Sequence, residues 1–173
     1  QGGIYRANAD AHVRALNDWV EQHARRAAHT IKGGYVSTYV AQKMGLAARL
    51  TRENSVMGLI FGPTGIGKTR CAQAVQQTTV GSVYLRIDHE NRIPRTLIPS
   101  LAAKVEALDY QRRAGDSLFR RLVARLSDSG RLVLIDEANN LSNNGLRALR
   151  DLHDETGCPV LLIGVKELHD RIL

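Results

Sequence analysis

One octapeptide constrains the fold of this chain more than any other stretch. The run GPTGIGKT at 62–69 satisfies the pattern G-x-x-x-x-G-K-T, and it lies between an apolar run at Val56–Phe61 and a helical pattern at Lys68–Thr78. In such a loop, glycines let the backbone curl so that amide hydrogens and the helix amino terminus face bound phosphate groups. The sequence therefore predicts a strand, a phosphate-binding loop and a helix, in that order. The alternative, a glycine turn before an ordinary helix, is disfavoured by the preceding strand.

The loop also predicts the ligand, which we expect to be ATP with Mg²⁺. The Lys68 ammonium would reach the β- and γ-phosphates, and the Thr69 hydroxyl would ligate Mg²⁺. The predicted nucleotide-binding residues are Gly62, Pro63, Thr64, Gly65, Ile66, Gly67, Lys68, Thr69 and Arg70.

An acidic pair forms the second half of the predicted site. Asp136 and Glu137 follow the apolar strand predicted at Leu132–Ile135, and strand ends are where sheets of this kind bind ligands. Asp136 would hold Mg²⁺ through water or through the Thr69 shell. Glu137 would orient and deprotonate the water that attacks the γ-phosphate. The alternative is that the two carboxylates only cap the next helix.

Short apolar runs alternate with helical patterns over most of the chain. We predict strands at Val56–Phe61, Val83–Ile87, Leu132–Ile135 and Val160–Ile163. We predict helices at Ser37–Glu53, Lys68–Thr78, Thr96–Leu108, Ser117–Ser127 and Ser142–Glu155. Continuous apolar strands in strand-helix-strand units are typical of an α/β domain with a doubly wound parallel sheet covered on both faces. Residues 1–36, with a helical stripe over Ala9–Ala28, are predicted to be a helical appendage to a core at 37–173.

Composition narrows the class of protein. The 173 residues are enough for one ordinary domain, and no apolar stretch approaches the roughly 20 residues that span a bilayer. We therefore expect a cytoplasmic protein with no membrane partner. The two cysteines are expected to be reduced structural thiols, because the predicted fold places them too far apart for a bridge. A net charge of +7 favours a polyanionic partner such as nucleic acid.

Three segments together resemble the AAA+ ATPases. They are GPTGIGKT, then LVLIDEANNL at 132–141, then LRDLHDETGCPVLLIG at 149–164, and the last of them narrows the resemblance to the target-selection ATPases of DNA transposition, the group of MuB and TnsC. The resemblance covers about residues 37–173. It implies a bacterial or phage-encoded ATPase that forms a ring or helical filament on double-stranded DNA when ATP is bound and recruits or activates a transposase. Hydrolysis would then disassemble the oligomer.

The chain departs from the family pattern after the predicted fourth strand. Family members place a polar sensor residue directly after the position of Gly164, where this chain has Val165. An apolar side chain cannot hydrogen-bond the γ-phosphate or the attacking water, so we expect either slow hydrolysis or a sensor supplied by another residue. Lys166 and Arg171 follow, without a motif that assigns either as an arginine finger, and we do not expect the family's C-terminal lid within these 173 residues.

Basic residues at two places are the candidates for DNA contact. The resemblance implies that the loop at 88–95 faces nucleic acid, so Arg92 and Arg95 would contact phosphates, although a solvated loop with incidental charges fits equally well. The helix at Ser117–Ser127 is expected to expose Arg120 and Arg121, together with Arg125, as a basic stripe or as an ordinary surface face. A helix-turn-helix at Ser37–Asn54, broken at Gly45, is a less favoured alternative to a plain helix.

Two other classes of function fit the same motifs. A helicase loader or replication initiator shares the predicted fold and both halves of the site. A nucleotide switch that controls a protein partner without touching DNA is the rival outside nucleic-acid binding. Aromatic residues are scarce, at 5% of the chain, so a stacking platform for single strands is not indicated.

Overall fold

The computed structural model describes residues 38–106 and 118–172, so the predicted appendage at 1–36 lies outside the described residues. Four parallel strands form one sheet in the order β1-β4-β3-β2. The strands are β1 (Met57–Phe61), β2 (Val83–Arg86), β3 (Val133–Asp136) and β4 (Val160–Gly164). All of them were predicted, with bounds that differ by one residue or none at each end. The predicted α/β class with a parallel sheet is confirmed.

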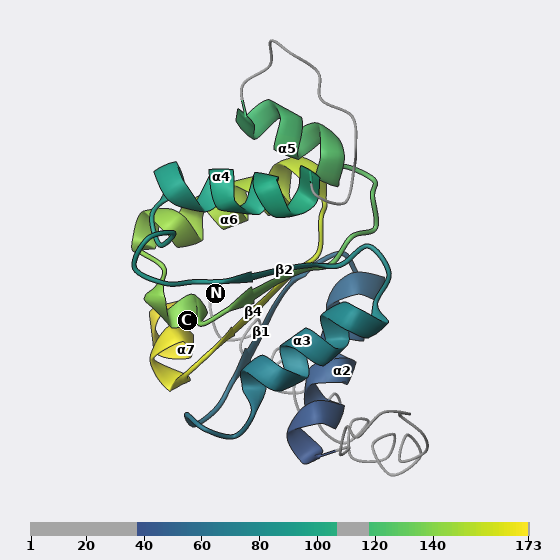
Figure 1. Ribbon diagram of the computed structural model, residues 1–173, viewed down its shortest axis with the longest axis vertical. Coiled ribbons are helices and arrows are strands. Elements are labelled where there is room, and N and C mark those ends of the chain that lie inside the picture. Colours follow the sequence, from purple (N-terminus) through teal and green to yellow (C-terminus); the bar gives the residue numbers. More distant parts are fainter. Residues whose placement is uncertain (1–37, 107–117, 173) are drawn as a thin grey trace, which may run out of the picture.

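Helices cover both faces of the sheet (Figure 1). One face carries α2 (Tyr39–Glu53) and α3 (Lys68–Thr78), and the other carries α4 (Pro94–Glu106), α5 (Leu118–Leu126) and α6 (Asn143–Thr156). A short 3-10 helix, η1 (Ala138–Asn140), follows β3, and α7 (Lys166–Ile172) follows β4 and contacts β1. The predicted helices at 68–78 and 142–155 match closely, whereas the ends of the helices predicted at 96–108 and 117–127 fall partly outside the described residues.

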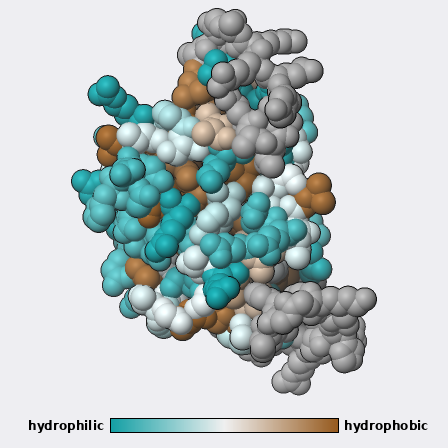
Figure 2. Space-filling view, viewed as in Figure 1, coloured by the Kyte–Doolittle hydropathy of each residue, from teal (hydrophilic) through white to brown (hydrophobic). Residues whose placement is uncertain are grey.

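Each face of the sheet has its own apolar core. Alternate residues of a strand point to opposite faces, so Leu132 and Leu134 pack with α2 and α3, whereas Val133 and Ile135 pack with α4, α5 and α6. On the face drawn in Figure 2, apolar residues of the described part lie in small separate groups among hydrophilic ones. The hydrophobic side chains are therefore used mainly to hold helices onto the sheet.

Strand β1 differs from the predicted fully buried strand. Its residues are half-buried or exposed, and Phe61 is 44% exposed, while every residue of β3 and β4 is buried. The reason is the strand order, which places β1 at the edge of the four-stranded sheet beside β4 only. An apolar run in the sequence does not distinguish an edge strand from a central one.

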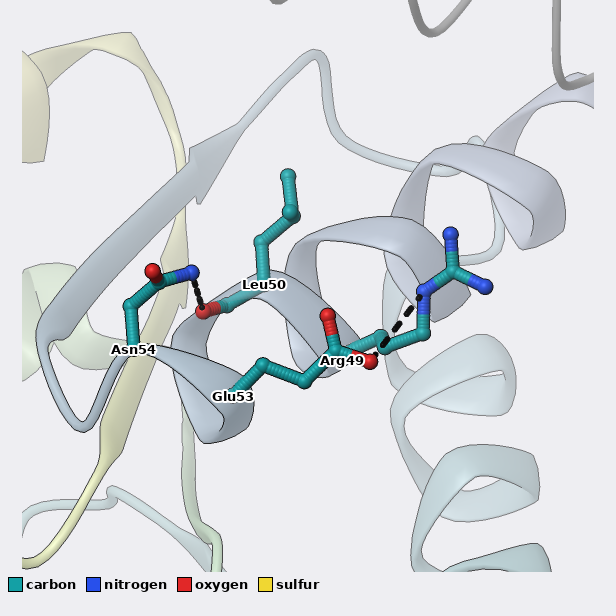
Figure 3. Close-up of polar contacts among 4 residues, drawn as sticks. All are labelled: Arg49, Leu50, Glu53 and Asn54. Atoms are coloured by element: carbon teal, nitrogen blue, oxygen red, sulfur yellow. Dashed lines mark hydrogen bonds and ion pairs between the residues drawn. The ribbon is translucent and has the colours of Figure 1, made fainter.

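Helix α2 settles the choice between a plain helix and a helix-turn-helix. It runs without interruption through Gly45, so the helix-turn-helix alternative is wrong. Thr38 caps its amino end by accepting from the Ala41 N–H at 3.2 Å. At its other end the Asn54 side-chain amide donates to Leu50 O at 2.8 Å, beside an exposed Arg49–Glu53 ion pair at 3.9 Å (Figure 3). The helix thus ends just before β1 begins.

The two cysteines are free and buried, as predicted. Cys71 lies in the core under α2 and α3, and Cys158 lies in the core on the other face. Burial raises the pKa of the Cys158 thiol to about 12. Both therefore act as small apolar side chains in the packing.

Candidate functional site

The phosphate loop joins the end of β1 to the start of α3. Gly65 and Gly67 have φ values of 85° and 94°, which a side chain rarely tolerates, so glycine is required at both positions. The Lys68 ammonium donates to Gly62 O at 2.8 Å and to Pro63 O at 2.7 Å. The loop is thereby curled around a fixed positive charge at the amino terminus of α3. That arrangement favours an anion there.

The acidic pair lies at the end of β3. Asp136 is only 1% exposed, and its two oxygens accept from different donors, Oδ1 from the Glu137 N–H at 3.0 Å and Oδ2 from the Tyr84 hydroxyl at 2.8 Å. Glu137 has a φ of 53° and precedes η1, but its side chain makes no capping hydrogen bond to that helix. The alternative that the Glu137 carboxylate caps the next helix is therefore wrong.

The phosphate loop and the acidic pair both lie at the carboxyl ends of parallel strands, on the same side of the sheet. Strand β4 lies between β1 and β3, and the Gly62 N–H donates to Gly164 O at 3.3 Å, which ties the start of the loop to the end of β4. Two interstrand spacings separate β1 from β3 by about 10 Å, a gap that a triphosphate can bridge. Thr69, in the first turn of α3, is half-buried, and Arg70 next to it is exposed.

The end of β4 contributes backbone and no polar side chain. Gly164 is buried, and a methyl group there would come within 2.7 Å of Leu168 and 3.1 Å of Asn139 Oδ1. Val165 follows with an apolar side chain, as the sequence shows. Asn139 Oδ1 is buried and has no hydrogen-bond partner among the residues that the structure describes. Asn139 and Tyr84 are two site residues that the sequence reasoning missed.

Arg171 on α7 is bound within its own chain. Its guanidinium donates to Asn139 O and Leu141 O, both at 2.9 Å, and to Asn143 Oδ1 at 3.0 Å. These bonds fasten α7 to the segment that follows the acidic pair. In this conformation the Arg171 guanidinium is bound to residues 139–143 of its own chain.

The loop after β2 and the first turn of α4 each present one exposed arginine, Arg92 and Arg95. Asp88 Oδ1 accepts from the N–H groups of Glu90 at 2.8 Å and Asn91 at 3.1 Å, which fixes the loop. Arg92 O then accepts from the Ser142 N–H at 3.0 Å, so the loop is tied to the start of α6. The side chains of Arg92 and Arg95 are exposed. This exposure fits both alternatives, contact with DNA phosphates and a solvated loop with incidental charges, so contact with DNA stays a prediction.

Gly145 permits this contact between the loop and α6. A methyl group at Gly145 would lie 2.6 Å from Arg92 O, so Gly145→Ala is expected to displace the loop and to destabilise the protein by about 1–3 kcal/mol. Thermal unfolding measured by circular dichroism would detect this loss. Gly45→Ala on α2 is the matched control, because nothing lies within 4 Å of a methyl group there, and it should raise stability through helix propensity. Equal melting temperatures for the two variants would contradict the contact.

The basic stripe predicted on α5 is only partly present. Arg120 is exposed, whereas Arg121 and Arg125 are half-buried, and Arg121 Nε is buried. The prediction that all three arginines face solvent is wrong, because α5 packs against the core through Leu122 and Leu126 and its flanks are covered as well. Of the three arginines on α5, Arg120 is therefore the exposed candidate for DNA contact.

One open cleft of about 570 Å³ lies between the carboxyl ends of α2 and α3, beside the start of β3. Arg52 lines it and donates to Gly130 O at 3.0 Å. The cleft lies at the amino ends of the strands, whereas the phosphate loop lies at their carboxyl ends. The cleft is therefore not part of the nucleotide site.

The fold and the site define an AAA domain. Residues 51–172 match the AAA domain family, and the chain belongs to it. The chain is also similar to two curated phage proteins. It is 26% identical over 168 residues to the ATP-dependent target DNA activator B of Escherichia phage Mu and, equally, to that of Escherichia phage D108, covering 97% of this chain and 54% of each relative.

A bacterial relative has a similar name. The Mu-like prophage FluMu DNA transposition protein B of Haemophilus influenzae is 21% identical over 170 residues, which cover 97% of this chain and 58% of that protein. The chain thus spans a little over half the length of the curated relatives it matches. No described helix combines the length and the apolar character needed to cross a membrane.

Proposed function

We propose that this protein is an ATP-dependent DNA-binding ATPase that oligomerises on target DNA and recruits or activates a transposase. The observation that carries the proposal is the placement of the phosphate loop and the pair Asp136 and Glu137 on either side of the end of β4, in a chain related to target DNA activators. The AAA domain family implies ATP binding. Hydrolysis is proposed from the residues of the site, and the roles of DNA and of a transposase are proposed from the relatives.

Mg²⁺ fits the oxygen donors of the site. In the described part of the chain, no group of three or more His, Cys, Asp or Glu side chains could hold a metal alone. At nucleotide sites Mg²⁺ takes most of its ligands from phosphates and waters and only one or two from the protein. The Thr69 hydroxyl and the Asp136 carboxylate would be the contributions of the protein. The ion would neutralise charge on the β- and γ-phosphates.

Hydrolysis would depend on Glu137. Its carboxylate is half-buried at the end of β3 and is not used as a helix cap, so it is available to take a proton from the attacking water. Lys68 would withdraw charge from the γ-phosphate. Since Val165 offers no polar group at the end of β4, turnover is proposed to be slow, and bound ATP would persist long enough to maintain an assembly.

DNA would be held through its phosphates, largely without reading sequence. Arg92 is exposed on the ordered loop after β2, and Arg95 is exposed in the first turn of α4. Arg120 is exposed on α5, with the half-buried Arg121 beside it as a weaker candidate. The net charge of +7 favours such a polyanion. A homo-oligomer, as a ring or a helical filament, would multiply these contacts along double-stranded DNA.

The direct test is equilibrium binding to a DNA duplex at moderate salt with ATP, ADP or a slowly hydrolysed ATP analogue. We expect tight binding with ATP and the analogue and weak binding with ADP. Replacing both Arg92 and Arg95 by Ala should weaken binding similarly for unrelated sequences and reduce the slope of log affinity against log salt. Arg150→Ala, on the exposed side of α6, is the matched control. Affinity that ignores the nucleotide would refute the proposal, and absence of DNA binding would favour a switch that acts on a protein.

A further inference from the structure

The buried carboxylate of Asp136 is held by a partner from another strand. The Tyr84 hydroxyl on β2 donates to Oδ2 at 2.8 Å, while the Glu137 N–H donates to Oδ1 at 3.0 Å. With Asp136 only 1% exposed, these two bonds fix the rotation of the carboxylate about its Cβ–Cγ bond. The Glu137 N–H belongs to the backbone, and any residue except proline would supply it. The bond from Tyr84, in contrast, depends on the tyrosine side chain.

Tyr84 is itself well placed to act as a donor. A tyrosine hydroxyl carries one proton that it can donate, and Asp136 Oδ2 accepts that proton at an O···O distance of 2.8 Å. Its ring packs against the core between the sheet and the α2 and α3 layer. The same cluster contains Cys71 and Ala72 of α3. Tyr84 therefore lies in the layer of the helix that follows the phosphate loop, and its hydroxyl binds the strand that carries Asp136.

We propose that Tyr84 is the positioning residue of the Mg²⁺ site, since its hydroxyl orients the Asp136 carboxylate toward the ion. This inference rests on the proposed nucleotide function and assigns a residue that neither the loop nor the acidic pair contains. Groups that orient metal-binding carboxylates are typically worth about 10- to 100-fold in metal affinity. Without the hydroxyl, Oδ2 would lose its donor in a buried place and the carboxylate would be free to rotate.

The test is Tyr84→Phe, which removes a single oxygen atom. Binding of a fluorescent ATP analogue is measured at equilibrium across a range of Mg²⁺ concentrations and again in excess chelator. We expect the Mg²⁺ concentration at half-maximal binding to rise by about 10- to 100-fold, with nucleotide affinity in chelator unchanged. Tyr39→Phe is the matched control, since Tyr39 is 66% exposed on α2, and it should leave the Mg²⁺ dependence as in the wild type.

A second comparison separates orientation of Asp136 from a general effect on the fold. In an Asp136→Asn background, adding Tyr84→Phe should not shift the Mg²⁺ dependence further, because both changes act on the same contact. A Tyr84→Phe protein with the wild-type Mg²⁺ midpoint, or an additive shift in the double variant, would overturn the inference while leaving the proposed ATPase intact. A wild-type protein that binds no nucleotide at any Mg²⁺ concentration would overturn both.

Discussion

Glu137→Gln should keep ATP bound and lower its turnover by about 10²- to 10⁴-fold, the usual contribution of a general base. The amide matches the carboxylate in shape but cannot accept the proton of the attacking water. Nucleotide affinity should stay close to that of the wild type, because Lys68 and the loop backbone remain. Phosphate release under single-turnover conditions measures the chemical step, and nucleotide binding is measured separately.

The control for this variant is Glu155→Gln, an equivalent change on the exposed surface of α6, which should hydrolyse ATP at the wild-type rate. If ATP maintains an assembly on DNA, the Glu137→Gln protein should also stay on DNA longer than the wild type in the presence of ATP. Wild-type turnover in Glu137→Gln would remove Glu137 as the base and would direct attention to other polar groups near the end of β4, such as Asn139.

The parts of the site that the sequence predicted are those set by local chemistry. The loop at 62–69 needs glycine at positions of positive φ and a lysine at the helix start, and each requirement is visible as a residue type at a fixed spacing. The same holds for two carboxylates after an apolar strand. Parallel strands connected by helices all have their carboxyl ends on the same side of the sheet. The sequence alone therefore also predicts that the loop and the two carboxylates lie on that side.

The contacts that the sequence did not predict are those between segments that are far apart in the chain. Tyr84 reaches Asp136 across 52 positions because β2 lies beside β3, which depends on the strand order and on register. Arg171 reaches Asn139 in the same way, through the packing of α7. No spacing pattern in the sequence around Tyr84 or Arg171 indicates either of these contacts.

The sequence also did not predict the exposed fraction of the arginine side chains on α5. A helical stripe predicts which side of a helix faces the core, but it does not predict how far neighbouring elements cover the flanks. Arg121 and Arg125 are half-buried for that reason, although their positions on the helix are compatible with a solvent-facing stripe. The DNA-binding proposal therefore depends chiefly on Arg92 and Arg95.

Lys68→Ala should abolish ATP binding, with the dissociation constant rising by about 100-fold or more. The ammonium would make more than one charge-assisted hydrogen bond to the phosphates, each worth about 1.5–3 kcal/mol. Its removal also leaves Gly62 O and Pro63 O, which now accept from Lys68 at 2.8 Å and 2.7 Å, without that donor. The loop would then lose its central charge as well as its contact to the ligand.

Thermal unfolding with and without ATP and Mg²⁺ measures this effect. ATP at 100 times its wild-type dissociation constant should stabilise the wild type by about 2.7 kcal/mol, and the same concentration should stabilise Lys68→Ala by about 0.4 kcal/mol or less. Lys104→Ala, an exposed lysine on α4, is the matched control and should respond to ATP as the wild type does. A wild-type response in Lys68→Ala would place ATP away from the loop at 62–69, and the roles proposed for Thr69, Asp136 and Glu137 would fail with it, because they all depend on phosphates held at that loop.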